Sequence, residues 1–475
     1  MKKLINNMMI ALLAILLPTA ITACSDKDNG DSVTPELTIT VGDVEISALD
    51  FYGNSGYKMV AIRSTVDFDL SIDADWCQIS NRGGAATKTD YQTMWLKISV
   101  DKNESTSNRS ATLTATAGSL VKRLTINQNG TYAVDDYGFE VAMMALQNMG
   151  NGVNIGNTLD ANGDWISSDD PKDYETSWGN PQVTPELIAA YKNAGFKAIR
   201  LPVTWRQHID NDGNIIHPLW MARVREVVDY IINAGMYCIL NVHHDTGGSD
   251  VAWLRAWQDE EYLENTEKKF AGLWTNIANE FNSYGDKLLF EGYNEMLDGN
   301  LRWTETDDKG YAALNRLAQS FVNTIRATGG NNGHRNLIVN TYSADGHENT
   351  LAAFKLPNDP IANHLIVEIH NYTPGEFVSP ETAEDAKQWN SSYAAEVDEA
   401  FALLERYITS QGVPAIIGEF GCNDKVPETE QAKYVEYFLS KTKQLGVSSF
   451  HWFDLIDRNT LEWKFSTVKD LLVRQ

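Results

Sequence analysis

Apolar and polar residues follow two different rhythms along the chain. Between residues 36 and 130, short stretches alternate apolar and polar side chains with a period of two, and Gly, Asn, Asp and Ser separate them. This alternation predicts antiparallel strands with one face in water, and several such strands within roughly a hundred residues favour a small β-sandwich. The clearest strands are expected at residues 37–41, 66–70, 94–100, 111–115 and 122–128.

From residue 137 onward, continuous apolar runs alternate with longer amphipathic segments. The runs lie at residues 152–159, 196–203, 237–244, 288–295, 336–343, 364–372, 415–421 and 448–455, and predict strands buried on both faces. Helices are predicted at 218–233, 270–281, 314–325 and 397–408, and also after Thr184, which is placed to cap a helix that begins with Pro185. Eight strands alternating with helices indicate a (β/α)8 barrel. The predicted fold class is α/β, a TIM barrel preceded by a small all-β sandwich.

An open, doubly wound sheet is the alternative arrangement of such segments. It would carry a glycine-rich phosphate loop after its first strand. Residues 152–157 read GVNIGN, which lacks both the third glycine and the start of a helix. We therefore expect the barrel.

The first residues predict export and attachment to a membrane. Lys2 and Lys3 precede an apolar segment at residues 8–21 that is too short for a comfortable membrane span. Residues 21–24 read ITAC, which resembles a bacterial lipobox, and the SDKDN that follows resembles the surface-export signal of Bacteroidetes lipoproteins. The resemblance implies a signal peptide at 1–23, a lipid anchor on Cys24, a linker at 24–35 and a place on the surface of the outer membrane. A plain secretory signal is the alternative.

Composition narrows the class of partner. The 475 residues carry a net charge of −25, which argues against nucleic acid because its phosphates would be repelled. Cys77, Cys238 and Cys422 are an odd set without metal-type spacing, so we expect them to be packing residues. No cofactor and no metal is implied, and we expect a monomer.

The N-terminal segment resembles the BACON domain family. Residues 75–79 read DWCQI, residues 103–113 read NESTSNRSATL, and residues 126–130 close the segment with INQNG. The resemblance covers residues 36–130 and implies an immunoglobulin-like sandwich of a kind that often precedes carbohydrate enzymes. We see no catalytic set of residues in this segment. Trp76 is expected in its core or, alternatively, as a platform for a sugar ring.

Polar and aromatic residues stand at the ends of almost all the predicted barrel strands. In enzymes with this fold, the carboxyl ends of the strands carry the active site. The residues found there are Asn157, Arg200, His243, His244, Asp245, Asn294, Glu295, His370, Tyr372, Glu419 and Trp452. Because random surface loops would not supply such side chains after so many apolar runs, we expect them to converge at the mouth of a barrel spanning residues 137–475.

Glu295 and Glu419 have the clearest chemistry. Glycoside hydrolysis needs one carboxylic acid to protonate the leaving oxygen and one carboxylate to attack the anomeric carbon. We expect Arg200 to lower the pKa of Glu419 and Tyr372 to donate to it, whereas Glu295, near fewer positive groups, is the predicted proton donor. Carboxyl groups of a retaining pair lie about 5–5.5 Å apart, and those of an inverting pair roughly 6.5–9.5 Å apart. Trp452 and Trp178 are the candidate platforms for sugar rings.

These strand-end residues together resemble glycoside hydrolase family 5, a family of retaining enzymes. The match is carried by Arg200, His243, Asn294, Glu295, His370, Tyr372, Glu419 and Trp452. It implies that Glu295 is the acid/base, Glu419 the nucleophile, Asn294 a partner of the sugar 2-hydroxyl and Trp452 the floor of the cleavage subsite. Residues 157–161 (NTLDA), 178–181 (WGNP) and 329–335 (GGNNGHR) resemble subfamily 4. That subfamily implies an endo-acting β-1,4-glucanase on cellulose-type, xyloglucan or mixed-linkage glucan.

Two departures and three alternatives stay open at this point. Met296 stands where the family usually has proline, and residues 453–458 (FDLIDR) differ from the commoner ending. A metal hydrolase would use His243, His244, Asp245, His370 and Glu419, although adjacent histidines on a strand cannot point the same way and Arg200 would oppose a cation. A non-catalytic surface glycan-binding protein is the second alternative. A β-mannanase or xylanase on the same scaffold is the third.

Overall fold

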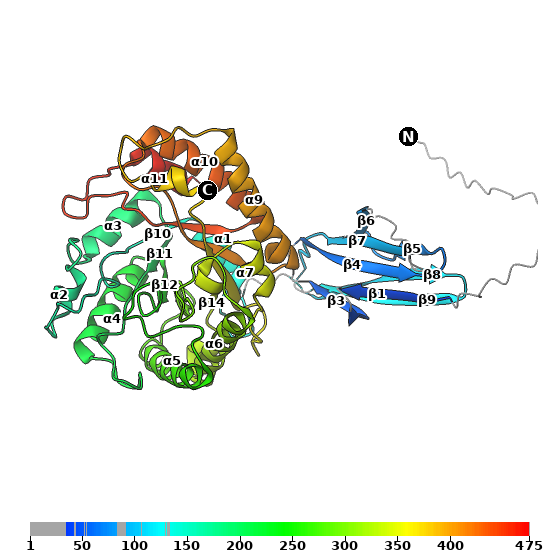
Figure 1. Cartoon of the computed structure of the whole chain (residues 1–475), viewed down its shortest axis with the longest axis horizontal. Helices are drawn as coiled ribbons and strands as arrows, with labels where there is room; N and C mark the ends of the chain where they lie inside the picture. The colour runs from blue at the N-terminus through cyan, green and yellow to red at the C-terminus, as the bar shows by residue number, and fades with distance from the viewer. Residues whose placement is uncertain are drawn as a thin grey trace, which may run out of the picture.

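The chain forms a β-sandwich followed by a closed barrel (Figure 1). We analysed a computed structural model that describes residues 35–41, 44–51, 53, 55–82, 92–105, 107–128, 130 and 134–474. Cys24, the expected signal peptide and most of the linker lie outside these residues. The predicted fold class is confirmed. Among the described helices, none is both long enough and apolar enough to cross a bilayer.

Two sheets make up the sandwich, and their inner faces share one hydrophobic core. The first sheet has the order β2 (Val44–Glu45), β1 (Leu37–Val41), β4 (Gly56–Ser64), β7 (Gln92–Val100) and β6 (Cys77–Arg82). The second has the order β3 (Ala48–Phe51), β9 (Leu120–Gln128), β8 (Arg109–Ala117) and β5 (Asp69–Ile72). The alternation is clearest on β8, where Ala111, Leu113 and Ala115 are buried and the residues between them are not.

The sandwich departs from the sequence prediction in two places. β3 pairs with β9 in parallel, so the strands are not all antiparallel; the chain changes sheets between Glu45 and Ala48 and approaches β9 from the same end. The strand expected at 66–70 begins only at Asp69, because the Ser64 hydroxyl donates to the Val66 carbonyl (2.6 Å) and bends the chain there. Trp76 packs against the core with the Arg109 guanidinium 4.2 Å from its ring centroid, so that face of the ring is covered.

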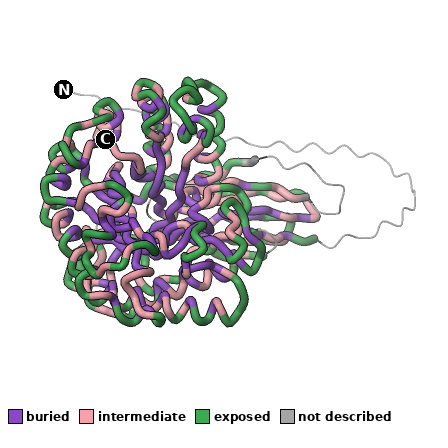
Figure 2. The backbone as a smooth tube through the Cα atoms, turned by 60° about the vertical axis from the view of Figure 1, so that its left-hand side comes forward, coloured by how far each residue is buried: buried purple, intermediate pink, exposed green. Residues whose placement is uncertain are grey.

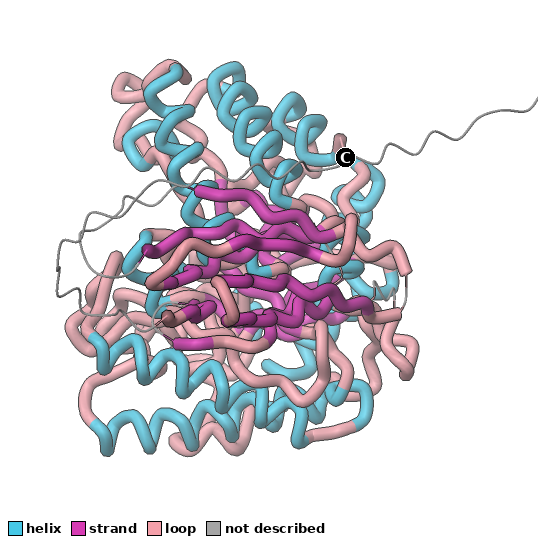
Figure 3. The backbone as a smooth tube through the Cα atoms, turned by 90° about the vertical axis from the view of Figure 1, so that its right-hand side faces the viewer, coloured by secondary structure: helices cyan, strands magenta, loops and turns pink. Residues whose placement is uncertain are grey.

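Eight parallel strands close the barrel, each beside its neighbour in the sequence, with β10 against β17. They are β10 (Gly152–Asn154), β11 (Ala198–Leu201), β12 (Tyr237–Asn241), β13 (Leu288–Glu291), β14 (Leu337–Asn340), β15 (Leu365–His370), β16 (Ala415–Phe420) and β17 (Ser448–His451). All their residues are buried, as the unbroken apolar runs predict. In Figure 2 the buried residues gather inside the barrel domain and the exposed ones lie on its outside, and Figure 3, seen from the side of the sandwich, shows helices above and below the strands. Most strands end earlier than predicted, because the last residues of each run leave the sheet and form the loops at the mouth.

Helices surround the barrel. They are α2 (Pro171–Glu175), α3 (Pro185–Ala194), α4 (Pro218–Asn233), α5 (Glu260–Glu280), α6 (Asp308–Ala327), α7 (Glu348–Ala353), α8 (Gly375–Val378), α9 (Ser391–Tyr407), α10 (Glu428–Leu445) and α11 (Ser466–Val473), with short 3-10 turns η1 (Gly330–Gly333), η2 (Tyr342–Ala344) and η3 (Thr409–Gln411). The Thr184 hydroxyl caps α3 as predicted, by accepting from Leu187 N. α5 begins ten residues before the predicted helix, where Asp259 caps it. Cys77, Cys238 and Cys422 are buried and unpaired, as expected.

A helix seals the end of the barrel where the strands begin. α1 (Ala142–Met149) packs Ala142, Ala145, Leu146 and Met149 against apolar residues near the start of the strands, among them Ile239. The sandwich attaches at this end: a Cβ on Gly56 of β4 would lie 3.3 Å from the Ser410 carbonyl of η3, which leads into β16.

The connector to the barrel is also fixed at this end. The Asp135 carboxylate lies 2.6 Å from His334 Nδ1 and 3.4 Å from His364 Nε2, and both histidines precede strands. The opposite end, where the strands finish, is the mouth.

Candidate active site

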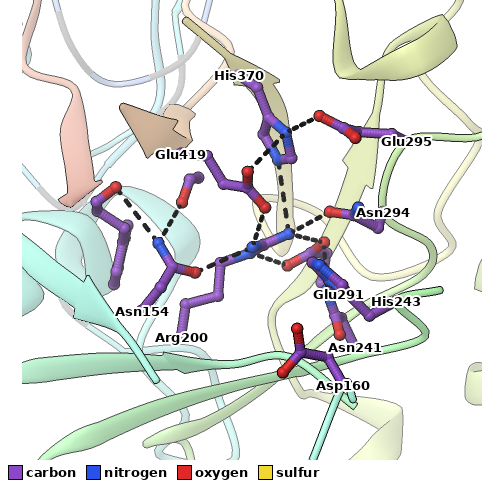
Figure 4. Close-up of polar contacts among 12 residues, drawn as sticks. Asn154, Asp160, Arg200, Asn241, His243, Glu291, Asn294, Glu295, His370 and Glu419 are labelled. Atoms are coloured by element: carbon purple, nitrogen blue, oxygen red, sulfur yellow. Dashed lines mark hydrogen bonds and ion pairs between the residues drawn. The ribbon is translucent and has the colours of Figure 1, made fainter. Parts of the chain in front are cut away.

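Arg200 stands at the centre of the mouth (Figure 4). It is fully buried on β11, and its guanidinium binds both oxygens of Glu291 at 2.7 Å. The same guanidinium lies 2.8 Å from Glu419 Oε1 and donates to the side-chain oxygens of Asn154 (3.0 Å) and Asn294 (2.8 Å). A planar guanidinium with five donors can hold several acceptors at once, which a lysine cannot do. Arg200 therefore fixes residues from several strands in one arrangement.

Glu419 faces donors on both of its oxygens. Oε1 binds Arg200, and Oε2 accepts from the Tyr372 hydroxyl at 2.9 Å and lies 3.5 Å from His370 Nδ1. Burial raises the pKa of Glu419 and the charges of His370 and Arg200 lower it, with a net rise. The prediction that this pKa falls is wrong in sign, because removal from water costs the carboxylate more than its cations return.

Glu295 lies beside His370. His370 Nδ1 is 2.8 Å from Glu295 Oε1, and the Glu295 side chain keeps about a quarter of its surface exposed. Burial opposes the charge of His370, but Glu419 and Glu295 outweigh burial and raise its pKa to about 10, so it is an imidazolium at neutral pH. Glu295 thus has one cationic neighbour, whereas Glu419 has two. That difference agrees with the expectation that fewer positive groups approach Glu295.

The two carboxylates face each other across the mouth at short range. An oxygen of Glu295, a nitrogen of His370 and an oxygen of Glu419 all lie within 4.8 Å of one another. The carboxyl groups of a retaining pair lie about 5–5.5 Å apart and those of an inverting pair roughly 6.5–9.5 Å apart. An approach of single oxygens to within 4.8 Å favours the retaining arrangement.

Trp452 and His243 form one wall beside the pair. Their rings are stacked at 5.6 Å with an interplanar angle of 7°. A Cβ on Gly156 would lie 2.7 Å from the Trp452 ring, so the small residue makes room for the indole. Asn241 Nδ2 lies 3.0 Å from His243 Nδ1, which leaves the proton of the neutral imidazole on Nε2. Burial and the neighbouring cations hold the pKa of His243 well below its ordinary value, so this ring stays neutral.

His244 and Trp178 extend this wall. The Trp178 ring is 5.3 Å from His244, is 39% exposed, and is fixed by its indole N–H, which donates to the Asn162 carbonyl. Burial opposes the charge of His244, but buried Asp160, whose Oδ2 is 3.6 Å away, raises the pKa of His244. An exposed indole held in this way presents a flat face to a sugar ring.

Two asparagines take different positions. The side-chain oxygen of Asn294 accepts a hydrogen bond from Arg200. The amide nitrogen of Asn294 therefore faces the mouth as a donor. Asn157 is exposed in the loop after β10, in a left-handed conformation with φ 57°. The Asn157 backbone carbonyl accepts a hydrogen bond from the Asn180 side-chain amide, and this bond fixes the position of Asn157. The structure therefore gives the Asn294 side chain, more than that of Asn157, a defined place at the mouth.

Four polar residues of the network were not predicted. Asn154, Asn241, Glu291 and Glu368 lie inside the apolar runs of β10, β12, β13 and β15, and all are buried. A charged residue within such a run was a usable signal, because an unpaired buried carboxylate is costly and implies a buried cation nearby. Arg200 is that cation.

The residues of the alternative metal site come together only in part. Asp245 accepts N–H groups from Trp205 (2.7 Å) and Trp253 (2.6 Å) and does not join the histidines. The rings of His243 and His244 are only 4.5 Å apart, because both follow the end of β12 at Asn241. The prediction that they point apart is therefore wrong. Ligand-type atoms lie within 4.8 Å of one another in two groups, Asp160 with His243 and His244, and Glu295 with His370 and Glu419.

The two departures from the family pattern have structural accounts. Met296 is fully buried in the barrel core, and its carbonyl accepts from Ser343 N at 3.1 Å, so it ties the loop after β13 to η2. In the last loop, the Arg458 guanidinium pairs with Asp454 and donates to the Gly156 carbonyl at 2.8 Å. Residues 453–458 thus hold the loop that carries Gly156 under Trp452.

A hollow of about 670 Å3 lies beside Glu295, which lines it. Trp303, Asp345, His347, Tyr372 and Glu399 are among the residues that line it. Trp303 is 48% exposed. Besides Trp178, a second exposed indole thus lies in the hollow that Glu295 lines.

Comparison with known families agrees with this geometry. A family model described as cellulase (glycosyl hydrolase family 5) matches residues 159–454, more than half of the chain. The chain belongs to glycosyl hydrolase family 5. A second model, the BACON family, described as a putative N-terminal binding domain, matches residues 65–129 of this family 5 hydrolase.

Relatives of the hydrolase include characterised enzymes and solved structures. Endoglucanase A of Clostridium longisporum is 34% identical over 387 residues, covering 77% of this chain and 72% of the relative. The xyloglucan-specific endo-β-1,4-glucanase BoGH5A of Bacteroides ovatus is 27% identical over 483 residues and covers 93% of this chain and 90% of its own length. The crystal structure of the family 5 enzyme PbGH5A of Prevotella bryantii is 40% identical, with a TM-score of 0.65, covering 70% of this chain and 98% of that one.

Proposed function

We propose that this family 5 hydrolase cleaves internal β-1,4 bonds of glucan backbones by double displacement with retention. The observation that carries the proposal is the short separation of Glu295 and Glu419, whose oxygens approach within 4.8 Å. In the first step, Glu295 donates its proton to the leaving oxygen while Glu419 attacks the anomeric carbon and forms a glycosyl ester. In the second step, Glu295 takes a proton from water, the water oxygen replaces Glu419, and two inversions give net retention.

The neighbouring groups support these roles. Tyr372 and Arg200 orient the two oxygens of Glu419, so one lone pair is aimed at the sugar without a further search over rotamers. Asn294 presents its amide N–H to a hydroxyl of the same ring, and Trp452 supplies the apolar face. These contacts surround the sugar whose bond is cut.

Xyloglucan is the substrate we infer among the β-glucans. A variant of PbGH5A has been solved in complex with the xyloglucan tetradecasaccharide XXXGXXXG, and the Bacteroides ovatus family 5 xyloglucanase with an XXXG heptasaccharide. The hollow beside Glu295, with Trp303 and polar groups on its walls, offers room for branches on the leaving-group side of the cut. A β-mannan or xylan backbone is the competing substrate.

We also propose where the enzyme works. Cys24 in the ITAC sequence would carry the lipid anchor, and the chain would stand on the outer surface of the outer membrane as a monomer. Labelling with radioactive palmitate tests the anchor, since the Cys24→Ala variant should lose the label and be released into the medium. Whole-cell protease accessibility tests the surface location.

Product analysis of the purified protein tests the activity. We expect reducing ends to be released from xyloglucan, mixed-linkage glucan and carboxymethylcellulose, with the β-anomer appearing first by NMR. Glu295→Gln and Glu419→Gln should each lower kcat/KM by at least about 10³-fold. Mannan or xylan as the preferred substrate would reassign the backbone, and the α-anomer as the first product would overturn retention. A wild-type protein that binds these glucans but releases no reducing ends would be a glycan-binding protein.

A further inference from the structure

Glu368 is a buried carboxyl that the proposed reaction does not use. It lies on β15, two residues before His370, and none of its surface is exposed. Its Oε1 is 3.3 Å from Arg200 Nε and 3.3 Å from His370 Nε2. Among the described residues, its Oε2 has no hydrogen-bond partner. A buried carboxyl with one bare oxygen is costly, which indicates that its place behind the active site has a use.

The neighbouring strand is shaped to admit this side chain. A Cβ on Gly418 of β16 would lie 1.6 Å from Glu368 Oε1, so Glu368 occupies the space that any other residue at 418 would fill. The pairing of β15 with β16 shifts register between Ile369 and His370, and the pairing of β16 with β17 shifts between Ile417 and Phe420. Such irregularities re-aim side chains, and here the shift brings Glu419 opposite His370.

His370 lies between Glu368 and the catalytic pair. Its Nδ1 faces Glu295 at 2.8 Å and Glu419 at 3.5 Å, whereas its Nε2 faces Glu368 at 3.3 Å and lies 3.5 Å from Arg200 Nη2. An imidazolium donates from both nitrogens, so Glu368 receives the proton that points away from the mouth. We propose that Glu368 is a positioning residue of the hydrolysis reaction, which holds His370 from behind and offsets the positive charge that His370 presents to Glu295.

The offset matters because the acid needs its proton. A bare imidazolium beside Glu295 would favour its carboxylate form, whereas a negative charge behind the imidazolium favours the acid form. The groups facing Glu368 are Arg200 on β11, Glu291 on β13 and His370 on its own strand, with Glu419 on β16 next to them. Burial and the Glu291 charge raise the pKa of Glu368 to about 7, against the opposing effects of Arg200 and His370.

A specific pH signature follows. Below about pH 7, Glu368 is neutral and a glutamine in its place changes little. Above pH 7, Glu368 gains its negative charge and offsets the positive charge that His370 presents to the catalytic pair. Removing the carboxylate should therefore shift the alkaline limb of the kcat/KM profile to lower pH and leave the acid limb in place.

The test compares Glu368→Gln with the wild type and with Glu175→Gln on a soluble glucan that the wild type cleaves. Glu175 is equally buried and pairs with Arg223 at 2.8 and 2.9 Å, but that pair involves α2 and α4, away from the carboxylate pair. For Glu368→Gln we expect kcat/KM below pH 7 to stay near the wild-type value and the alkaline limb to move down by about one pH unit. For Glu175→Gln we expect the wild-type profile.

The proposal rests on the proposed glycosidase function, and the two fail differently. If the wild type cleaves no glucan, the function itself is wrong. If the wild type is active and the alkaline limb of the folded Glu368→Gln variant coincides with it, Glu368 is only structural and the proposal is overturned. Circular dichroism shows whether the glutamine variant folds. If it does not, Glu368→Ser removes the same charge with a smaller side chain, and the alkaline limb of its kcat/KM profile decides in the same way.

Discussion

A single arginine organises the charged residues at the mouth. Arg200 pairs with Glu291 and Glu419 and approaches Glu368, while His370 is the second cation. Breaking one buried pair leaves the other partners unsatisfied, which costs more than the pair itself contributes. The residues of this network therefore depend on one another, and single substitutions will not add.

Gly418→Ala is a direct probe of that dependence. The new methyl group would meet Glu368 Oε1 at 1.6 Å, so Glu368 must leave its place between Arg200 and His370. We expect a loss of roughly 1–3 kcal/mol in the free energy of unfolding, measured with urea, and lower kcat/KM in the protein that remains folded. Gly285→Ala is the control, because nothing lies within 4 Å of its added methyl group. Equal stability of the two variants would contradict the assigned packing of Glu368.

Sequence patterns identified only part of the charged network at the mouth. Arg200, Asn294 and Glu419 were found because each lies in the C-terminal half of a predicted apolar run. Glu291 and Glu368 were not, because period and hydrophobicity do not show which residues of a strand buried on both sides face the barrel interior. The sign of the pKa shift of Glu419 also depends on its depth of burial, which the order of residues does not contain.

At the level of elements, some parts of the barrel are fixed by contacts between residues close in the sequence, and others by contacts between residues far apart in it. Thr184 caps α3 through a contact three residues away, so a local motif was sufficient to predict where that helix starts. α1 is different, because its partners come from seven of the eight strands. Its role as a seal was not predicted, since no local pattern names such distant partners.

The seal should be important for stability and unimportant for chemistry. Leu146 is 2% exposed and packs in the cluster of α1 with the starts of the strands. We expect Leu146→Ala to lower the free energy of unfolding by about 2–5 kcal/mol in urea titrations. At urea concentrations well below the midpoint of unfolding, kcat/KM should stay unchanged. Gln147→Ala on the exposed side of the same helix should change neither quantity. A fall in kcat/KM at full folding would show instead that α1 communicates with the mouth.

For the whole molecule, the connector between sandwich and barrel is the part to test. Asp135 joins it to His334 and lies 3.4 Å from His364 Nε2, and the Tyr137 ring packs on His334 with centroids 3.9 Å apart and an interplanar angle of 33°. We expect Asp135→Asn to speed proteolytic cleavage near residues 134–140 several-fold, because the neutral amide loses the charge-assisted contact with His334. Activity on a short soluble substrate should stay unchanged. Asp136→Asn, one residue away and exposed, is the matched control, and equal cleavage of the two variants would count against the link.

The attachment of the sandwich also sets a distance. β1 begins at Leu37 beside Ser64, at the far end of β4 from Gly56, which touches the barrel. The nine residues of β4 span roughly 30 Å at about 3.3 Å per residue. A chain held by its N-terminus would therefore carry the barrel on a stiff arm of that length, fixed to the end away from the mouth. On an enzyme anchored as we propose, such an arm would give a bulky, branched polymer clearance from the membrane surface, so that the cut could be made in the middle of the polymer.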